Sequence, residues 1–289
     1  MPGHIPVLLD EVIQFLDPKP GGRFIDATLG AGGHARAILE RTAPNGTLLA
    51  LDQDESSLSS AKATLESFGS RVTFIHSNFR ALKTIAEARG FIGCDGVLAD
   101  IGISSMMVDD PARGFSFMRE GPLDMRMDRT QALTAADVVN TYSEKEIADI
   151  IYTYGEERRS RPIARSIVHS RPLQTTIDLV RSIERVSGSP RYGQLHPATR
   201  TFQAMRIYVN DELNSLQEFL DAAMAAVRAG GRVVAVTFHS LEDRIVKQKF
   251  RAPVVPGRVL TKKVVMATDD EVQRNPRARS AKLRAWERS

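Results

Sequence analysis

The stretch from Arg23 to His34, RFIDATLGAGGH, constrains the fold of this chain more than any other. Residues 23–27 have the composition of a short buried strand, three glycines follow at once, and residues 34–40 have helical composition. This order is the entry of a nucleotide-type βαβ unit, in which missing Cβ atoms let a ligand lie against the backbone. With Ala35 the loop also fits the dinucleotide pattern G-x-G-x-x-[GA], and a tight turn that binds nothing remains an alternative.

Two carboxylates indicate which ligand the loop binds. Asp52 ends a second apolar strand about twenty residues after the glycines, where a carboxylate accepts both hydroxyls of a ribose. Asp26 lies just before the glycines, where it repels a pyrophosphate and attracts the cationic methionine end of S-adenosylmethionine. The sequence therefore favours S-adenosylmethionine as the cofactor. An NAD-dependent oxidoreductase is the alternative, and it explains Gly30 and Asp52 but not Asp26.

The first hundred residues alternate strands and helices. Continuous apolar strands in such an alternation predict an α/β fold with a parallel, doubly wound sheet. Ligands of these sheets bind beyond the carboxyl ends of the strands, which is where Gly30, Asp52, Asn78–Phe79 and Asp100 fall. The Phe79 ring is equally compatible with the core and with an adenine-stacking face.

The alternation stops between Ile101 and about Val209. Residues 101–128 are rich in Gly, Pro and polar residues, and long irregular stretches in compact domains are usually functional. Amphipathic helices follow at 143–154, 157–169, 176–186 and 196–209, and Ser143 with Glu146 forms a capping box. We expect an inserted all-helical substrate-binding lobe at 104–210, with a helical lid or a dimer surface as the alternative.

The sheet pattern then resumes. The sequence predicts a helix at 212–228 that Gly230 and Gly231 end, a strand at 232–238, a helix at 242–250, a loop with one strand between 253 and 270, and a final strand near 282–286. The sheet domain is therefore expected at 1–103 and 211–289.

Composition narrows the class of protein. The chain has 289 residues, one cysteine (Cys94) and a formal net charge of +4. A disulfide framework and a cysteine-built metal cluster are excluded, and we expect no metal. No apolar run approaches twenty residues, and the start MPGHIPVLLDEV is neither a signal peptide nor a transit segment, so we expect a cytoplasmic enzyme with no membrane partner. Arginines gather at 158–171 and 274–288, which favours a polyanionic substrate over plain solvated surface.

Eight segments, taken together, resemble one family over nearly the whole chain. They are HIPVLLDEV, DATLGAGGH, DGVLADIGISS, RGFSFMREGPLDMRMD, YGEERRSRPIARSIV, HPATRTFQAMRIYVNDEL, GGRVVAVTFHSLEDRIVK and NPRARSAKLRAWE. The family is ribosomal RNA small-subunit methyltransferase H, also called MraW. The resemblance implies a class I, Rossmann-like S-adenosylmethionine-dependent methyltransferase with a helical insert. It also implies methylation of the exocyclic N4 of a cytidine in the decoding region of small-subunit (16S) ribosomal RNA, within an assembling or assembled subunit.

The resemblance also assigns donor-binding positions. They fall on Gly32, Gly33, His34, Asp52, Phe79 and Asp100, and on Met107, where the family usually has glutamine. The substitution at Met107 removes a polar contact with the donor.

Catalysis and RNA binding suggest further residues. A cytosine amino group is a weak nucleophile that must be aligned with the methyl group, so Asp100 is the candidate catalytic acceptor and positioning residue. Arg200 and Arg206 are candidates for phosphate contacts, and His239 and Ser240 for the base pocket. His239 is equally compatible with helix capping, and either arginine with a structural pairing to Asp211 or Glu212.

Other functions remain open from the residues alone. They are methylation of another RNA or DNA amino group, and a non-catalytic S-adenosylmethionine- or RNA-binding module. The sequence leaves the oligomeric state open, a homodimer included.

Overall fold

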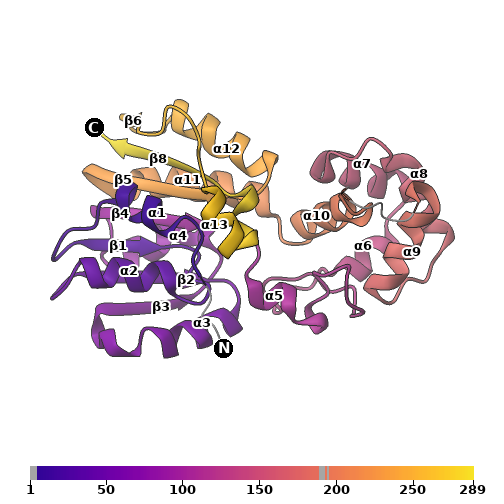
Figure 1. Cartoon of the computed structure of the whole chain (residues 1–289), viewed down its shortest axis with the longest axis horizontal. Coiled ribbons are helices and arrows are strands. Elements are labelled where there is room, and N and C mark those ends of the chain that lie inside the picture. The colour runs from indigo at the N-terminus through magenta and orange to yellow at the C-terminus, as the bar shows by residue number, and fades with distance from the viewer. Residues whose placement is uncertain (1–4, 189–192, 194) are drawn as a thin grey trace. The chain divides into compact units, whose positions relative to one another are not determined.

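The computed structural model describes residues 5–188, 193 and 195–289, in which the chain forms two compact units (Figure 1). The first consists of Met1–Gly102 and Leu213–Ser289, and the second of Ile103–Glu212. None of the helices described over these residues is long and apolar enough to cross a membrane.

The first unit is built on one mixed sheet with strand order β3-β2-β1-β4-β5-β8-β6, to which β7 adds by pairing with β8 (Figure 1). Its strands are β1 (Arg23–Asp26), β2 (Thr47–Asp52), β3 (Val72–His76), β4 (Cys94–Asp100), β5 (Val227–Thr237), β6 (Gly257–Val259), β7 (Val265–Met266) and β8 (Lys282–Arg288). Strands β1 to β5 pair in parallel. The carboxyl ends of β1, β2 and β4 therefore meet at one edge of the sheet, which is the edge that positions the candidate site.

Helices cover both faces of the sheet, because successive strand residues alternate between two apolar cores. Leu48 and Ala50 of β2 face the core that α1, α2 and α3 cover, whereas Leu49 and Leu51 face the core beneath α4, α11 and α12. The helices of this unit are α1 (Leu9–Leu16), α2 (Gly33–Arg41), α3 (Glu55–Thr64), α4 (Leu82–Ala88), α11 (Glu212–Ala226), α12 (Ser240–Arg251) and α13 (Asp269–Arg274).

The parallel pairing predicted for the strands of the first hundred residues is confirmed. The last long strand, β8, runs antiparallel to β5 and β6, so the whole sheet is mixed. One prediction about this sheet was wrong. Gly230 and Gly231 do not end a helix, because α11 ends at Ala226 and both glycines lie inside β5. The register between β4 and β5 shifts here, and a Cβ on Gly231 would lie 3.1 Å from the carbonyl oxygen of Asp95. The glycines thus allow a bulge and a close approach of two backbones.

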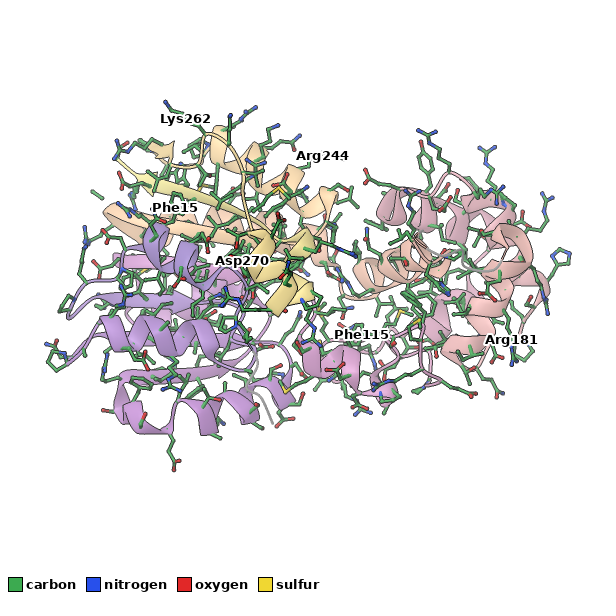
Figure 2. The ribbon with its side chains drawn as sticks, viewed as in Figure 1. Phe15, Phe115, Arg181, Arg244, Lys262 and Asp270 are labelled. Carbon is green, nitrogen blue, oxygen red and sulfur yellow. The ribbon has the colours of Figure 1, made fainter. Side chains whose placement is uncertain are left out.

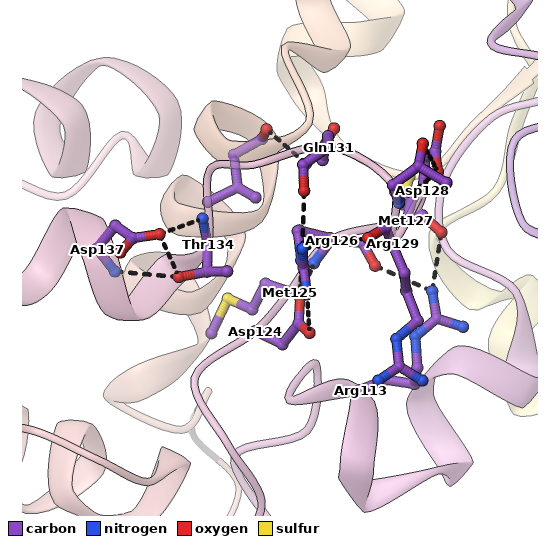
Figure 3. Close-up of polar contacts among 12 residues, drawn as sticks. Arg113, Asp124, Met125, Arg126, Met127, Asp128, Arg129, Gln131, Thr134 and Asp137 are labelled. Atoms are coloured by element: carbon purple, nitrogen blue, oxygen red, sulfur yellow. Dashed lines mark hydrogen bonds and ion pairs between the residues drawn. The ribbon is translucent and has the colours of Figure 1, made fainter.

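The second unit is helical. Its helices are α5 (Ser105–Asp109), α6 (Ala135–Thr141), α7 (Glu144–Gly155), α8 (Ser160–His169), α9 (Thr176–Ser187) and α10 (Ala198–Val209), and their apolar faces form one separate core. The predicted capping box of Ser143 and Glu146 is confirmed at the start of α7. Helix α6 was not predicted, although Thr134 and Asp137 form a capping box at its N-terminus (Figure 3).

The irregular stretch between α5 and α6 is held by polar contacts that are buried or partly buried (Figure 3). The Arg126 guanidinium donates to both oxygens of Asp124, at 2.7 and 2.9 Å. Nη2 of the buried Arg113 donates to the carbonyls of Arg126 and Met127, both at 2.9 Å. These side-chain hydrogen bonds satisfy backbone carbonyls that a helix or strand would otherwise pair, so the backbone of this irregular stretch is held in one conformation.

Candidate functional site

Three carboxylates meet at the carboxyl ends of neighbouring strands. Asp26 ends β1, Asp52 ends β2 and Asp100 ends β4, and β1 lies between the other two strands. They are close enough to perturb one another, because the charge of Asp52 raises the pKa of Asp26 and the charge of Asp26 raises that of Asp100. The predicted convergence of strand-end residues is therefore present within the first unit.

The glycine loop lies between two of these carboxylates and leaves open space. Gly30 has φ +53° and donates its amide to Oδ2 of Asp52 at 2.8 Å, and a Cβ on it would meet no atom within 4 Å. Gly32 has φ +85°, a conformation that side chains rarely adopt. A Cβ on Gly33, the first residue of α2, would lie 2.4 Å from Pro6. Gly30 thus leaves open space in which a ligand can lie against the backbone, whereas Gly33 allows the close approach of Pro6.

Asp52 has a structural role that the sequence did not reveal. Its Oδ1 accepts the amide of Asp54 at 2.9 Å while its Oδ2 accepts that of Gly30. Burial raises the pKa of this carboxyl to about 6, an increase that the two amide bonds partly offset. Asp52 therefore shapes the glycine loop in addition to presenting an acceptor at the strand end.

Asp26 holds a buried oxygen with no protein partner. Its Oδ1 accepts the amide of Thr28 at 3.1 Å, whereas Oδ2 has no hydrogen-bond partner among the described residues. Burial is the main reason that its pKa rises to about 7. A buried acceptor without a partner is costly, and a bound cation or donor group would satisfy it.

Asp100 shows the same pattern more strongly. Its Oδ1 is buried and has no hydrogen-bond partner among the described residues, and its backbone amide donates to Oγ1 of Thr28 at 2.6 Å. Burial, then the charges of Asp26 and Glu242, raise its pKa to about 8. Perturbed carboxyl groups gathered in one place are typical of binding and catalytic sites.

His34 lies against Asp100, a pairing that the sequence did not predict. Its Nε2 is 2.9 Å from the carbonyl oxygen of Val7, which fixes the ring, and Nδ1 is 3.8 Å from Oδ2 of Asp100. The imidazole is 7% exposed. His34 thus links the N-terminal segment to the strand-end carboxylates, and its predicted contact with the donor stays a prediction.

Phe79 lies at the carboxyl end of β3 with one side in the core. Asn78 caps the short turn Phe79–Ala81 and donates Nδ2 to Oε1 of Gln53 at 2.8 Å. The Phe79 ring meets Phe219 edge-on with centroids 5.0 Å apart, and 9% of the residue is exposed. The core reading of Phe79 is therefore supported, and stacking on adenine stays a prediction.

His239 and Ser240 follow β5 at the start of α12. Nε2 of His239 lies 2.9 Å from Oε1 of Glu242, whose Oε2 accepts the amide of Phe238 at 2.8 Å. His239 is thus the N-cap residue of α12, which matches the capping alternative, and Ser240 is the first residue of that helix. The buried Glu242, which these contacts organise, was not singled out from the sequence.

The remaining predicted residues belong to the second unit. Met107 is 4% exposed and lies in the core of that unit. Arg206 donates Nε and Nη2 to the two oxygens of the buried Glu212, at 2.9 and 3.0 Å, which is the structural alternative considered for it. The Arg200 side chain is 49% exposed, with Nη1 3.6 Å from Glu157, so it can reach an external anion.

Comparisons with known proteins agree with this reading. The family model described as the MraW methylase family matches residues 1–289. Ribosomal RNA small subunit methyltransferase H of Nostoc sp. is 52% identical over 287 residues, covering 99% of this chain and 92% of the relative. The protein of the same name from Dehalococcoides mccartyi is 47% identical over 302 residues, covering 99% and 86%. The solved structure of PH0851 is 14% identical with a TM-score of 0.50, covering 97% of this chain and 45% of that one, which bears on the fold alone.

Proposed function

This chain belongs to the MraW methylase family, and from that premise we propose that it methylates the exocyclic N4 of a cytidine in the decoding region of small-subunit ribosomal RNA. It is an S-adenosylmethionine-dependent methyltransferase with a Rossmann-like fold. The choice of N4, the cytoplasm as the place of action and an assembling or assembled subunit as the substrate are parts of the proposal.

The strand-end residues of the first unit suit the methyl donor. Asp52 is at the position where a ribose would be bound, and Gly30 leaves open space for the donor beside the backbone, while the backbone of Gly32 and Gly33 would border the donor site. The buried oxygens of Asp26 and Asp100 would face its positive charges, and those oxygens have no hydrogen-bond partner among the described residues. His34 and Phe79 would complete the donor site, whereas Met107 is buried in the core of the second unit and is not assigned a donor contact.

The chemistry requires alignment more than acid–base strength. When bound, S-adenosylmethionine supplies an electrophilic methyl group on a positively charged sulfur. The cytosine amino lone pair is delocalised into the ring, so hydrogen-bond acceptors on the amino protons favour the geometry that attacks. Alignment of two reactants can contribute on the order of 7–11 kcal/mol to rate enhancement.

Asp100 is the residue to which we assign this positioning. As a carboxylate it would accept an N4 proton, and it would take up that proton as the nitrogen becomes cationic. Its pKa of about 8 means that a nearby cation is needed to keep it ionised at neutral pH. The partnerless Oδ1 of this residue is the single observation that carries the proposal, because it offers a buried acceptor at the strand end.

The base and the RNA backbone would be held by other elements. His239 and Ser240, at the end of β5, are proposed for the base pocket, and the helical unit for binding RNA through Arg200. Arg206 is not proposed for a phosphate contact, because its Nε and Nη2 already donate to the two carboxylate oxygens of Glu212.

Mapping methyl groups in small-subunit RNA tests the proposal. RNA from cells that lack this protein is compared with RNA from the same cells carrying the wild-type gene. We expect one decoding-region cytidine to lose its N4-methyl group and to regain it on complementation. Loss of a methyl group from another base or another RNA would instead favour an alternative amino-group substrate, and an unchanged pattern would favour a non-catalytic binding module.

A further inference from the structure

A basic pocket lies at the outer edge of the sheet, away from the carboxylate site. Its volume is about 220 Å³, and its lining includes Lys247, Phe250 and Arg251 of α12 together with Thr261, Lys262 and Arg284. Figure 2 labels Lys262 on this outer side of the first unit, near α12. The pocket thus brings together cations from a helix, a loop and a strand that are far apart in sequence.

Three of these cations have no partner within the described part of the chain. Lys247, Arg251 and Lys262 are exposed, and no ion pair or hydrogen bond engages their charged groups there. The fourth, Arg284, is held by both oxygens of Asp243, at 2.7 and 3.1 Å. The pocket therefore presents positive charge that no described carboxylate neutralises.

Two acidic residues of neighbouring elements, Asp221 of α11 and Glu287 of β8, already bind other cations. Asp221 binds Nζ of Lys249 at 2.5 Å, and Glu287 binds both Arg232 and Arg258. Neither of them is left to neutralise Lys247, Arg251 or Lys262.

The pocket is built on a fixed framework. Lys247 and Arg251 are four residues apart on α12, so they lie on one face of the helix and repel each other. Phe250 is buried in the core beneath that helix. The buried Thr261 accepts the amide of Ala285 at 3.1 Å, which ties the residue before Lys262 to β8.

A purely structural reading explains only part of this arrangement. Basic residues in the last turn of a helix stabilise its carboxyl end, which accounts for Arg251. It does not account for Lys262, which comes from a different element, or for a hollow between the cations. Three cations around one hollow form a site suited to an oxyanion.

The pocket is well separated from the donor site within the same unit. Strand β1 carries Asp26, and the order β1-β4-β5-β8-β6 places four strand spacings between β1 and the strand beside the pocket. At about 4.8 Å a spacing, this is roughly 19 Å. An anion bound here is therefore not part of the reacting group.

We propose that this pocket binds phosphodiester groups of the substrate RNA at a distance from the methylated base. The inference rests on the proposed function, because an RNA substrate extends well beyond one nucleotide and carries a charge at every step. Phosphate contacts fix the register of a nucleic acid without reading its sequence. The pocket would thus help to position the target base without taking part in chemistry.

The test compares two triple variants of the full chain. The pocket variant is Lys247→Gln, Arg251→Gln and Lys262→Gln. The control, Arg41→Gln, Lys62→Gln and Arg89→Gln, removes the same charge from exposed residues of α2, α3 and the end of α4. Binding is measured from 50 to 200 mM salt to small ribosomal subunits from cells lacking this protein, and to a protein-free transcript of the same RNA.

At 200 mM salt the pocket variant should bind both RNAs about three- to tenfold more weakly than the control, which is the loss expected from one or two missing phosphate contacts, and the difference should be larger at 50 mM. The slope of log affinity against log salt should become shallower by about 0.7 to 1.4, as expected for one or two phosphates on a single strand. Melting temperature and S-adenosylmethionine affinity should match those of the control.

Two results would overturn the inference. One is equal RNA affinity and salt slope in the pocket and control variants. The other is a loss with whole subunits but not with the protein-free transcript, which would assign the pocket to an acidic surface of a ribosomal protein. RNA binding is measured separately from methylation. If the wild-type protein did not methylate N4, the proposed function would be refuted. A lower RNA affinity of the pocket variant than of the control would still support RNA binding by the pocket.

Discussion

Single residues at the strand ends are held near the point at which they change charge. Burial raises the pKa values of Asp52, Asp26 and Asp100 to about 6, 7 and 8. In water all three would be ionised well below neutral pH. The site therefore changes its charge between pH 5 and 8, and ligands of positive charge should bind it in a pH-dependent way.

Donor affinity should fall as the pH decreases. Protonation of Asp26 and Asp52 removes the charge that attracts S-adenosylmethionine, so between pH 8 and pH 5.5 its affinity should drop by up to about tenfold per pH unit for each protonated group. Titration calorimetry at several pH values measures this. The variant Asp26→Asn should bind the donor more weakly at pH 8 and show a flatter pH profile, and an affinity of the wild type that does not depend on pH would refute the assignment.

Ionisation of Asp100 should lower the free energy of unfolding at high pH. The folded-state pKa of about 8 exceeds the value of 3.8 for the free side chain, so the stabilisation from its bound proton is full below pH 4 and is lost as the pH rises through 8. Asn cannot ionise. Between pH 4 and pH 8 the free energy of unfolding of Asp100→Asn should therefore gain on the order of 5 kcal/mol relative to the wild type. Denaturant unfolding at both pH values checks this, and a constant difference would contradict it.

At the scale of elements, local sequence signals predicted more than tertiary pairing could. The capping box of Ser143 and Glu146 predicted the start of α7. Thr134 and Asp137 form the same kind of box at the start of α6, but this helix was not predicted because it follows a long polar stretch. The prediction that Gly230 and Gly231 end a helix was wrong, because a glycine pair after a helical segment is more often a helix terminus. Here the pair serves a bulge whose cause, the backbone of Asp95 on a neighbouring strand, is invisible to local patterns.

The two arginines of α10 should behave differently when replaced. Arg206→Ala removes two charge-assisted hydrogen bonds of the buried Glu212 and should lower the free energy of unfolding by roughly 2–4 kcal/mol. Arg200→Ala removes an exposed charge, so it should leave the free energy of unfolding within about 0.5 kcal/mol of the wild type. It should weaken RNA binding and reduce the slope of log affinity against log salt by about one. Melting temperature and salt-dependent RNA binding separate the two. A stable Arg206→Ala variant with weakened RNA binding would reverse the assignment.

At the scale of the whole molecule, the order of strands and helices predicted that Gly30, Asp52, Asn78–Phe79 and Asp100 lie at one edge of the sheet. That inference needed only the rule that parallel strands share a carboxyl edge. The antiparallel entry of β8 between β5 and β6 could not be predicted, because its apolar pattern is the same in either direction. The contact of His34 with Asp100 could not be predicted either, since it joins two segments whose distance in space the sequence does not specify.

The most direct test of the account is the single-turnover rate of methyl transfer by Asp100→Asn. Small subunits lacking the modification, saturating labelled S-adenosylmethionine and saturating enzyme are used, and the product nucleoside is identified. If Asp100 positions the cytosine amino group, the rate of N4-methylcytidine formation should fall by about a hundredfold or more while RNA affinity stays within about twofold of the wild type. A rate close to that of the wild type, or label on a nucleoside other than N4-methylcytidine in the wild-type reaction, would contradict it.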